Sequence, residues 1–198
     1  MRVSPPSRSS EATLSRSYGR SVFVVVLPPA KTIKMPGNPL PDAEQLLKAL
    51  IEQMRPAVGP ETGLIGIHTG GVWVAERLHQ ALKLKTPVAA LDVSFYRDDY
   101  AARGLRRDVK RSEMPFEIED RDVILVDDVL YTGRTIRAAL NELFDYGRPA
   151  GVKLATLVDR GGRQLPIAAQ FVGATLALKP GQSVVLKRDA KGKLALEL

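Results

Sequence analysis

Apolar residues recur at the spacing of an α-helix in three stretches of this chain. Asp42 is a suitable N-cap, and the apolar side chains after it have helical spacing: Leu46, Leu47, Leu50, Ile51 and Met54. Ordered structure is therefore expected to begin at Asp42. A second helix is predicted over residues 72–82. A third runs from about residue 134 to residue 146, where Gly147 and Pro149 form a helix-stop signal.

Strands are predicted at residues 64–67, 88–95, 123–126 and 152–158, and the first, third and fourth of these are apolar runs. Runs without alternation are typical of parallel strands that are buried on both faces. Strands alternating with helices predict an α/β fold with a doubly wound, mostly parallel sheet, in which loops at the carboxyl ends of the strands form the ligand crevice. Residues 171–196 are expected to form short strands and turns that cover this crevice as a small hood.

The first 40 residues differ in composition from the rest of the chain. They are rich in Ser, Pro and Arg and contain one acid, Glu11, against six basic residues. They carry 6 − 1 = +5 of the formal charge of +7, so the remainder is close to neutral. Residues 1–40 are predicted to be a disordered basic tail, and residues 41–198 a single domain. One hypothesis places the natural start at Met35.

The composition limits the cellular compartments and the kinds of functional site that are expected for this chain. The 198 residues include no cysteine, which excludes disulfides, thiolate metal sites and cysteine nucleophiles and favours a reducing compartment. No stretch approaches the roughly 20 apolar residues of a membrane span. We therefore expect a cytoplasmic protein without a membrane partner.

A distinctive motif follows the apolar run at residues 123–126. Two acids, Asp127 and Asp128, precede a short loop and then a helix, and the loop contains Thr132, Gly133, Arg134 and Thr135. N–H groups at a helix N-terminus carry partial positive charge, glycine permits close approach, and hydroxyls add donors, so this loop can hold a phosphate. The Gly-x-x-x-x-Gly-Lys-Ser/Thr pattern of a Walker loop is absent.

The acid pair at 127 and 128 has two interpretations. An isolated Asp-Asp pair is more often an N-cap and a surface acid. Here the two acids come directly after a buried strand, where they would be partly desolvated and costly without a partner. Carboxylates close to a phosphate loop can accept hydrogen bonds from the hydroxyls of a ribose lying between them, and we favour this second interpretation.

The segment at residues 123–135 resembles the phosphoribosyl-pyrophosphate motif of type I phosphoribosyltransferases. It is most similar to that of the bifunctional pyrimidine-operon regulators with uracil phosphoribosyltransferase activity. The resemblance covers roughly residues 42–180 and extends to three further segments, at 94–99, 143–149 and 157–167. It implies the type I phosphoribosyltransferase fold with a small hood. It also implies conversion of uracil and phosphoribosyl pyrophosphate to UMP and pyrophosphate.

The resemblance implies roles for individual residues. The catalytic acids Asp127 and Asp128 would hold the ribose 2′ and 3′ hydroxyls. Pyrophosphate would be bound by Thr69, Gly70, Gly71 and Arg97. The 5′-phosphate would be held by Val129, Leu130, Tyr131, Thr132, Gly133, Arg134 and Thr135, and the base would lie beside Val158, Asp159 and Arg160.

The reaction implied by the family is displacement of pyrophosphate by uracil N1 at the anomeric carbon, through an oxocarbenium-like centre. Mg²⁺ would be carried by phosphoribosyl pyrophosphate, so no direct protein ligand for the metal is expected. The family also implies a homodimer or a higher homo-oligomer.

Two departures from the family pattern bear on function. Relatives carry Thr-Arg-Gly at the pyrophosphate loop, whereas Gly70 replaces the Arg here, so a charge for the leaving group is missing. The regulators bind a leader RNA through basic residues. This chain keeps Arg163 but has Gly162, Ala168 and Ala174 where RNA-binding relatives have basic residues or histidine. Because RNA affinity rests mainly on phosphate neutralisation, weakened RNA binding is expected.

Two other functions stay open at the level of the sequence. One is a UMP-sensing, RNA-binding attenuation regulator with little catalysis, which predicts a salt-dependent RNA complex and negligible turnover. The other is a phosphoribosyltransferase for a different base, such as hypoxanthine or orotate. A purine would call for a larger hood, and orotate for an extra cation at its carboxylate.

Overall fold

The computed structural model describes residues 32–34, 40–93, 111–179 and 181–198. A six-stranded parallel sheet forms its centre, in the order β1-β6-β5-β4-β2-β3. The strands are β1 (Thr32–Lys34), β2 (Gly63–Ile67), β3 (Ala89–Leu91), β4 (Asp122–Leu130), β5 (Gly151–Asp159) and β6 (Phe171–Ala177). The predicted α/β fold with a mostly parallel sheet is confirmed.

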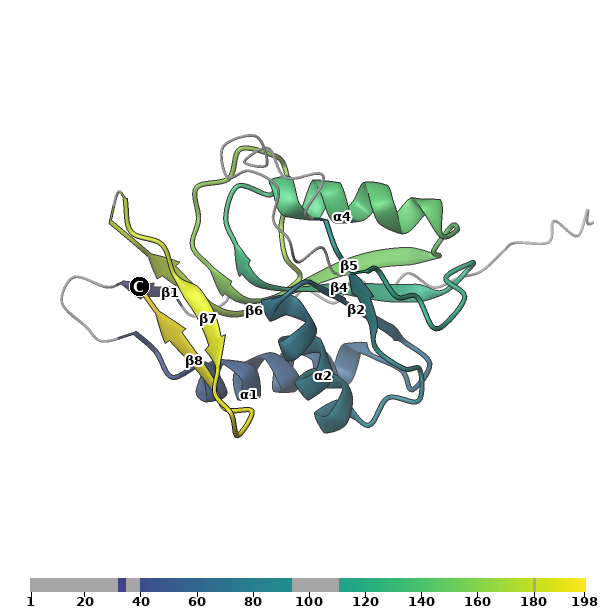
Figure 1. The fold of residues 1–198 in the computed structure, drawn as a ribbon, viewed down its shortest axis with the longest axis horizontal. Helices are drawn as coiled ribbons and strands as arrows, with labels where there is room; N and C mark the ends of the chain where they lie inside the picture. Colours follow the sequence, from purple (N-terminus) through teal and green to yellow (C-terminus); the bar gives the residue numbers. More distant parts are fainter. Residues whose placement is uncertain (1–31, 35–39, 94–110, 180) are drawn as a thin grey trace, which may run out of the picture.

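Helices lie on both faces of the sheet (Figure 1). One face is covered by α1 (Ala43–Met54), which continues into the short 3₁₀ helix η1 (Arg55–Ala57), and by α2 (Gly70–Leu82). The other face is covered by α4 (Arg134–Asp145). The carboxylate of Asp42 accepts a hydrogen bond from the Glu44 N–H at 3.0 Å, so the predicted N-cap of the first helix is confirmed.

The apolar pattern of the sequence becomes two hydrophobic layers. The first joins α1 and α2 to the sheet through large buried side chains that include Leu47, Leu50, Leu78 and Phe171. The second joins α4 to the opposite face, with Ile65, Leu125, Ile136 and Leu143 among its members. The strands between the layers are buried on both sides, as their uninterrupted apolar runs predict.

Three sequence expectations about strands are wrong. The strand predicted over residues 123–126 extends to Leu130, so both acids lie inside β4 rather than after it. Part of the expected hood, β6, is instead a strand of the main sheet beside β5. Strand β1 pairs with β6 within the range expected to be a disordered tail, so ordered structure does not begin at Asp42.

The remainder of the expected hood is an antiparallel hairpin of β7 (Val185–Arg188) and β8 (Leu194–Glu197). It lies beside α1 and α2 at one end of the molecule (Figure 1) and adds Val184, Leu186 and Leu194 to the first hydrophobic layer. The guanidinium of Arg188 lies 4.8 Å from the centre of the Trp73 ring on α2. The hairpin is therefore packed against the helix that follows β2.

A hydrogen-bonded ion pair fixes the hairpin to both helices. Arg77 donates from both terminal nitrogens to the carboxylate of Glu44, at 2.7 and 3.1 Å. The same carboxylate accepts the Leu194 N–H at 2.9 Å. These bonds favour the ionised acid, and the hydrogen bond from Arg77 is the main cause that lowers the pKa of Glu44 below its ordinary value.

In the part of the chain that the structure describes, no helix is long and apolar enough to cross a membrane.

Candidate active site

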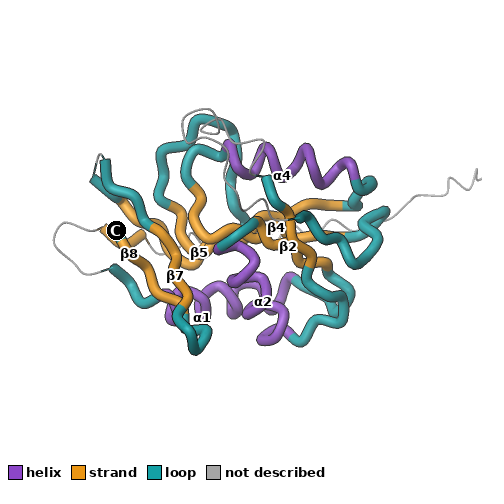
Figure 2. Tube along the Cα trace, viewed as in Figure 1, coloured by secondary structure: helices purple, strands orange, loops and turns teal. Residues whose placement is uncertain are grey.

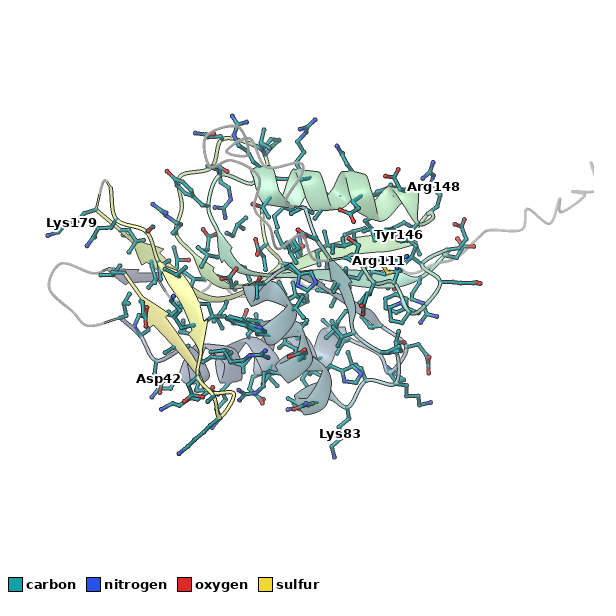
Figure 3. All side chains as sticks on the ribbon, in the orientation of Figure 1. Asp42, Lys83, Arg111, Tyr146, Arg148 and Lys179 are labelled. Carbon is teal, nitrogen blue, oxygen red and sulfur yellow. The ribbon has the colours of Figure 1, made fainter. Side chains whose placement is uncertain are left out.

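Two strand–loop–helix units open at the same edge of the sheet. Strands β2 and β4 are parallel neighbours, with Gly66 opposite Val126, so the connections leading into α2 and α4 begin side by side. Figure 3 labels Lys83 at the carboxyl end of α2 and Tyr146 beside the carboxyl end of α4. The amino end of each helix is the end away from its label, on the side where the strands of the sheet end. Neither helix has an acid in its first turn, which leaves both amino ends suited to anions.

The two acids occupy the end of β4 with different exposure. Asp127 is only 4% exposed and stands opposite Thr156 of β5, and its carboxylate accepts the Asp128 N–H at 3.1 Å. Asp128 is half-buried. The acid pair is thus held by the central strand itself, which gives it a more rigid support than a loop would.

Glycines allow the start of α2 to lie directly on the strands. A Cβ atom on Gly71 would be 2.3 Å from the carbonyl oxygen of Val126, and one on Gly66 would be 2.5 Å from Cα of Val72. A Cβ atom on Gly70 would be 2.3 Å from Oδ2 of Asp128. Gly70 therefore brings the backbone of the first turn of α2 against the carboxylate of Asp128. The peptide bond before Thr69, from His68, is cis.

The connection from β4 to α4 is a short loop at residues 131–133, here called the phosphate loop. Gly133 has φ of 89°, which favours glycine, and it is the N-cap residue of α4. The hydroxyl of Thr132 accepts the Arg134 N–H at 3.3 Å. This loop can offer backbone N–H groups and hydroxyls to a phosphate.

A second loop, at residues 160–167 and here called the base-side loop, follows β5 and lies against the phosphate loop (Figure 2). Its Gln164 and Leu165 N–H groups both donate to the carbonyl of Thr132, at 3.0 and 3.2 Å. The guanidinium of Arg160 lies 3.8 Å from the centre of the Tyr131 ring and donates to the carbonyl of Gln182 at 2.9 Å. The two loops form one continuous wall at the end of the sheet.

The structure brings most of the predicted site residues to this edge of the sheet. Some of them have exposed side chains there, and others have buried side chains. Val129 and Leu130 belong to β4 and pack in the hydrophobic layers, and Val158 is completely buried, so their side chains do not line the crevice. Tyr131 is 44% exposed. Thr135 lies in the first turn of α4, and Arg134 donates to Gln164 at 2.9 Å. Arg97 lies outside the described residues.

Sequence reasoning missed two parts of this site. In the sequence Gly66 is one member of an apolar run, although its lack of a side chain permits the approach of α2. Arg163 was considered only as a cation for RNA, whereas its guanidinium bonds to Asp159 and to backbone carbonyls of both loops. The sequence signal for the role of Arg163 is the Gly-Gly-Arg run directly after the strand that ends at Asp159.

Among residues 32–34, 40–93, 111–179 and 181–198, no three acids or histidines come together in a way that could hold a metal ion. A polar hollow of about 500 Å³ lies at the opposite, amino edge of the strands, among residues that include Glu61, Arg121 and Lys153. None of the predicted site residues lines it.

Comparison with known proteins agrees with this geometry. Residues 38–180 match the phosphoribosyl transferase domain family. A protein named Bifunctional protein PyrR from Nitrosococcus oceani is 52% identical over 143 residues, which are 71% of this chain and 81% of that protein. The protein of the same name from Pseudomonas paraeruginosa is 50% identical over 163 residues, 80% of this chain and 94% of the relative.

Solved structures show the same fold at low sequence identity. A hypoxanthine phosphoribosyltransferase from Staphylococcus aureus has a TM-score of 0.56 and 23% identity, with 75% of this chain and 81% of the other covered. A hypoxanthine-guanine phosphoribosyltransferase from Bacillus anthracis has a TM-score of 0.57 and 24% identity, with coverage of 75% and 86%.

This chain therefore belongs to the phosphoribosyltransferase family, as the resemblance of its sequence predicted. Within that family it is similar to the bifunctional PyrR proteins over most of their length.

Proposed function

We propose that this protein transfers the phosphoribosyl group of phosphoribosyl pyrophosphate to N1 of uracil, giving UMP and pyrophosphate. The observation that carries the proposal is the place of the acid pair. Asp128, beside the buried Asp127, lies against the first residue of α2, while the same strand continues into the phosphate loop and α4. The acids thus stand between two helix N-termini that suit the two charged ends of a single substrate.

Each part of the site would bind a different part of phosphoribosyl pyrophosphate. The amino end of α4, with Thr132 and Thr135, would bind the 5′-phosphate. The carboxylates of Asp127 and Asp128 would accept hydrogen bonds from the ribose 2′ and 3′ hydroxyls. The first turn of α2, with Thr69 and Gly70, would bind pyrophosphate through backbone N–H groups.

Catalysis by such a site rests on position and charge. Holding the ribose from both sides fixes the anomeric carbon in line between the leaving oxygen and uracil N1. Carboxylates beside the ribose stabilise the positive charge that develops on the ring as the bond to pyrophosphate breaks. The proton on N1 would pass to water or to an oxygen of the departing pyrophosphate, both of which can accept it.

Magnesium suits this site as an ion carried by the substrate. Mg²⁺ prefers oxygen ligands and keeps several waters, and it usually binds through one or two carboxylates together with substrate phosphates. The ion would be bound by oxygens of phosphoribosyl pyrophosphate and by water, while Asp127 and Asp128 hold the ribose hydroxyls, so we propose no direct side-chain ligand. When bound, the ion would neutralise charge on the leaving pyrophosphate.

The base would lie against the base-side loop. The residues that the family resemblance assigns to the base are Val158 and Asp159, at the end of β5, and Arg160, whose guanidinium lies over the Tyr131 ring. A pyrimidine is the base we propose, because the chain resembles the uracil-specific branch of the family over the matching segments.

A base panel tests the proposal. Purified protein is mixed with phosphoribosyl pyrophosphate, Mg²⁺ and uracil, hypoxanthine or orotate, and nucleotide formation is measured beside an Asp128→Asn variant. We expect UMP from uracil, little product from the other two bases, and a loss of activity on the order of 10²-fold in the variant. Product from hypoxanthine or orotate in preference to uracil would contradict the proposal.

A second role, regulation of pyrimidine-operon expression through RNA, is favoured by the word bifunctional in the names of the relatives. We propose that any RNA complex is weak, because Gly162, Ala168 and Ala174 supply no cations. Titration of a leader RNA at several salt concentrations tests it, and a tight complex that turns over no uracil would instead favour the regulator without catalysis.

We also propose that the protein is cytoplasmic and forms a homodimer or a higher homo-oligomer, as the family implies. Light scattering coupled to size-exclusion chromatography measures the assembly directly. A monomer at micromolar concentration would contradict this part of the proposal.

A further inference from the structure

Arg163 lies at the centre of the contacts between the phosphate loop and the base-side loop. Its Nη1 donates to the carbonyl of Tyr131 at 2.7 Å and is 3.5 Å from that of Leu130. Its Nε donates to the carbonyl of Ile167 at 3.0 Å, and its Nη2 to Oδ2 of Asp159 at 2.5 Å. One side chain thus joins the end of β4, the phosphate loop, the end of β5 and the far end of the base-side loop.

Only a guanidinium has donors in the directions that this cluster requires. Its five N–H groups form a rigid plane, whereas a lysine ammonium is a compact point charge on a flexible stem. The pair with Asp159 is charge-assisted, and the two side chains are 22% and 20% exposed, so solvent screens it only in part. Asp159 also accepts the Gly161 N–H at 2.9 Å, which shapes the start of the base-side loop.

Backbone hydrogen bonds between the loops support the same connection. The Arg160 N–H donates to the carbonyl of Leu130 at 3.1 Å, and those of Gln164 and Leu165 donate to Thr132. Gly162 has φ of 73°, and a Cβ atom there would be 2.5 Å from the Tyr131 ring. The loops are thus in close contact along their length, with the Arg163 guanidinium as the side-chain link between them.

We propose that Arg163 is a positioning residue that fixes the phosphate loop against the base-side loop and so sets the distance between bound 5′-phosphate and bound base. This inference rests on the proposed function for the identity of those two ligands. Transfer requires the anomeric carbon and the attacking nitrogen to be aligned, and a small misplacement of one loop costs rate as well as affinity. The donors of Arg163 that face the chain's own carbonyls are not directed toward an external phosphate.

The test compares Arg163→Gln and Arg163→Lys with Arg137→Gln. Arg137 is an exposed residue of α4 near the phosphate loop, so its substitution removes the same charge without touching the link. For Arg163→Gln we expect KM for phosphoribosyl pyrophosphate and for uracil to rise, and kcat to fall, each by about tenfold. Arg163→Lys should not restore them, and Arg137→Gln should stay within about twofold of the unmodified protein.

Amide hydrogen exchange gives a readout that does not depend on catalysis. In Arg163→Gln, the amides of Arg160, Gln164 and Leu165 should exchange faster, while those of α1 keep their rates. If Arg163→Gln does not fold, Arg163→Lys carries the same test, because an ammonium cannot reach all the acceptors.

Three results would overturn the inference. A merely structural role would lower the melting temperature and speed exchange throughout the chain with both KM values unchanged. A role in RNA binding would reduce the salt dependence of an RNA complex while KM and exchange stay as they were. Unchanged exchange in both Arg163 variants would overturn it directly. If the unmodified protein forms no UMP, the proposed function fails, and the exchange result still decides whether Arg163 links the loops.

Discussion

The two strand–loop–helix units at the carboxyl edge of the sheet both present a helix N-terminus to an anion, but they are built differently. In the β2–α2 unit, glycines at 66, 70 and 71 let the first turn of α2 lie directly on the strands, so anion binding there depends on backbone groups. In the β4–α4 unit, the phosphate loop contains Thr132, Thr135 lies in the first turn of α4, and the base-side loop is hydrogen-bonded to the phosphate loop. The first unit relies on close backbone contacts at the start of α2, and the second adds hydroxyl side chains and a hydrogen-bonded neighbouring loop.

The two units should therefore be sensitive to different substitutions. Close backbone packing makes the first turn of α2 intolerant of added atoms, whereas the phosphate loop should lose affinity for substrate when a hydroxyl is removed. Substitutions in each unit test this contrast.

Gly71→Ala should have the largest effect, on stability. The added Cβ atom would be 2.3 Å from the carbonyl oxygen of Val126, which belongs to a central strand and cannot easily move. We expect a decrease of about 1–3 kcal/mol in the free energy of unfolding, as for other overpacked sites. Urea denaturation measures it, and Gly59→Ala is the control, since nothing lies within 4 Å of a Cβ atom there. Equal stabilities for the two variants would contradict the packing argument.

Gly70→Ala should instead reduce activity more than stability. Its Cβ atom would meet the carboxylate of Asp128 rather than backbone, so the acid must shift away from its position. We expect kcat/KM to fall by about 10- to 100-fold, while the free energy of unfolding changes by less than about 1 kcal/mol. Steady-state kinetics and urea denaturation on the same sample separate the two effects. A variant with full activity would show that the position of Asp128 is unimportant.

Thr132→Val should have a moderate effect that is confined to one substrate. It removes a hydroxyl from the phosphate loop while nearly conserving volume. We expect KM for phosphoribosyl pyrophosphate to rise by about five- to tenfold, with KM for uracil nearly unchanged, because one hydrogen bond to a charged group is lost. Initial rates over both substrate concentrations test this. An equal rise in both KM values would argue against a dedicated phosphate position.

Glu44→Gln should have the smallest effect, and it should depend on pH. The pKa of Glu44 is lowered in the folded protein, so its contribution to stability is present above the ordinary carboxyl pKa and is lost as pH falls through the folded pKa. Because the partner Arg77 is 36% exposed, we expect no more than about 1 kcal/mol at neutral pH. Urea denaturation at pH 7 and at acidic pH should show the variant and the unmodified protein converging in acid. A constant difference between them would contradict the role of the ion pair.

Sequence patterns anticipate the β4–α4 unit better than the β2–α2 unit for a physical reason. The phosphate loop is local in sequence, so an apolar strand, two acids, threonines, a glycine and a helix can be read in order. The approach of Gly70 to Asp128 joins distant parts of the chain, and no local pattern reports it.

The strand errors have related causes. Reading strands from apolar runs ends β4 at Val126, although backbone pairing with β5 continues through the acids to Leu130. Parallel strands are usually connected by a helix. Strand β6 follows β5 through the base-side loop without a helix, so the alternation of strands and helices does not reveal its place in the main sheet. The pairing of β1 with β6 depends on a partner far along the chain, which local composition does not reveal.

The most direct test of the account is a crystal structure of the protein with UMP, pyrophosphate and Mg²⁺. We predict the 5′-phosphate at the amino end of α4 beside Thr132, pyrophosphate at the amino end of α2 beside Gly70, and the ribose hydroxyls on Asp127 and Asp128. UMP bound with its phosphate at α2, or away from both helix N-termini, would contradict the assignment of the two units to the two ends of one substrate.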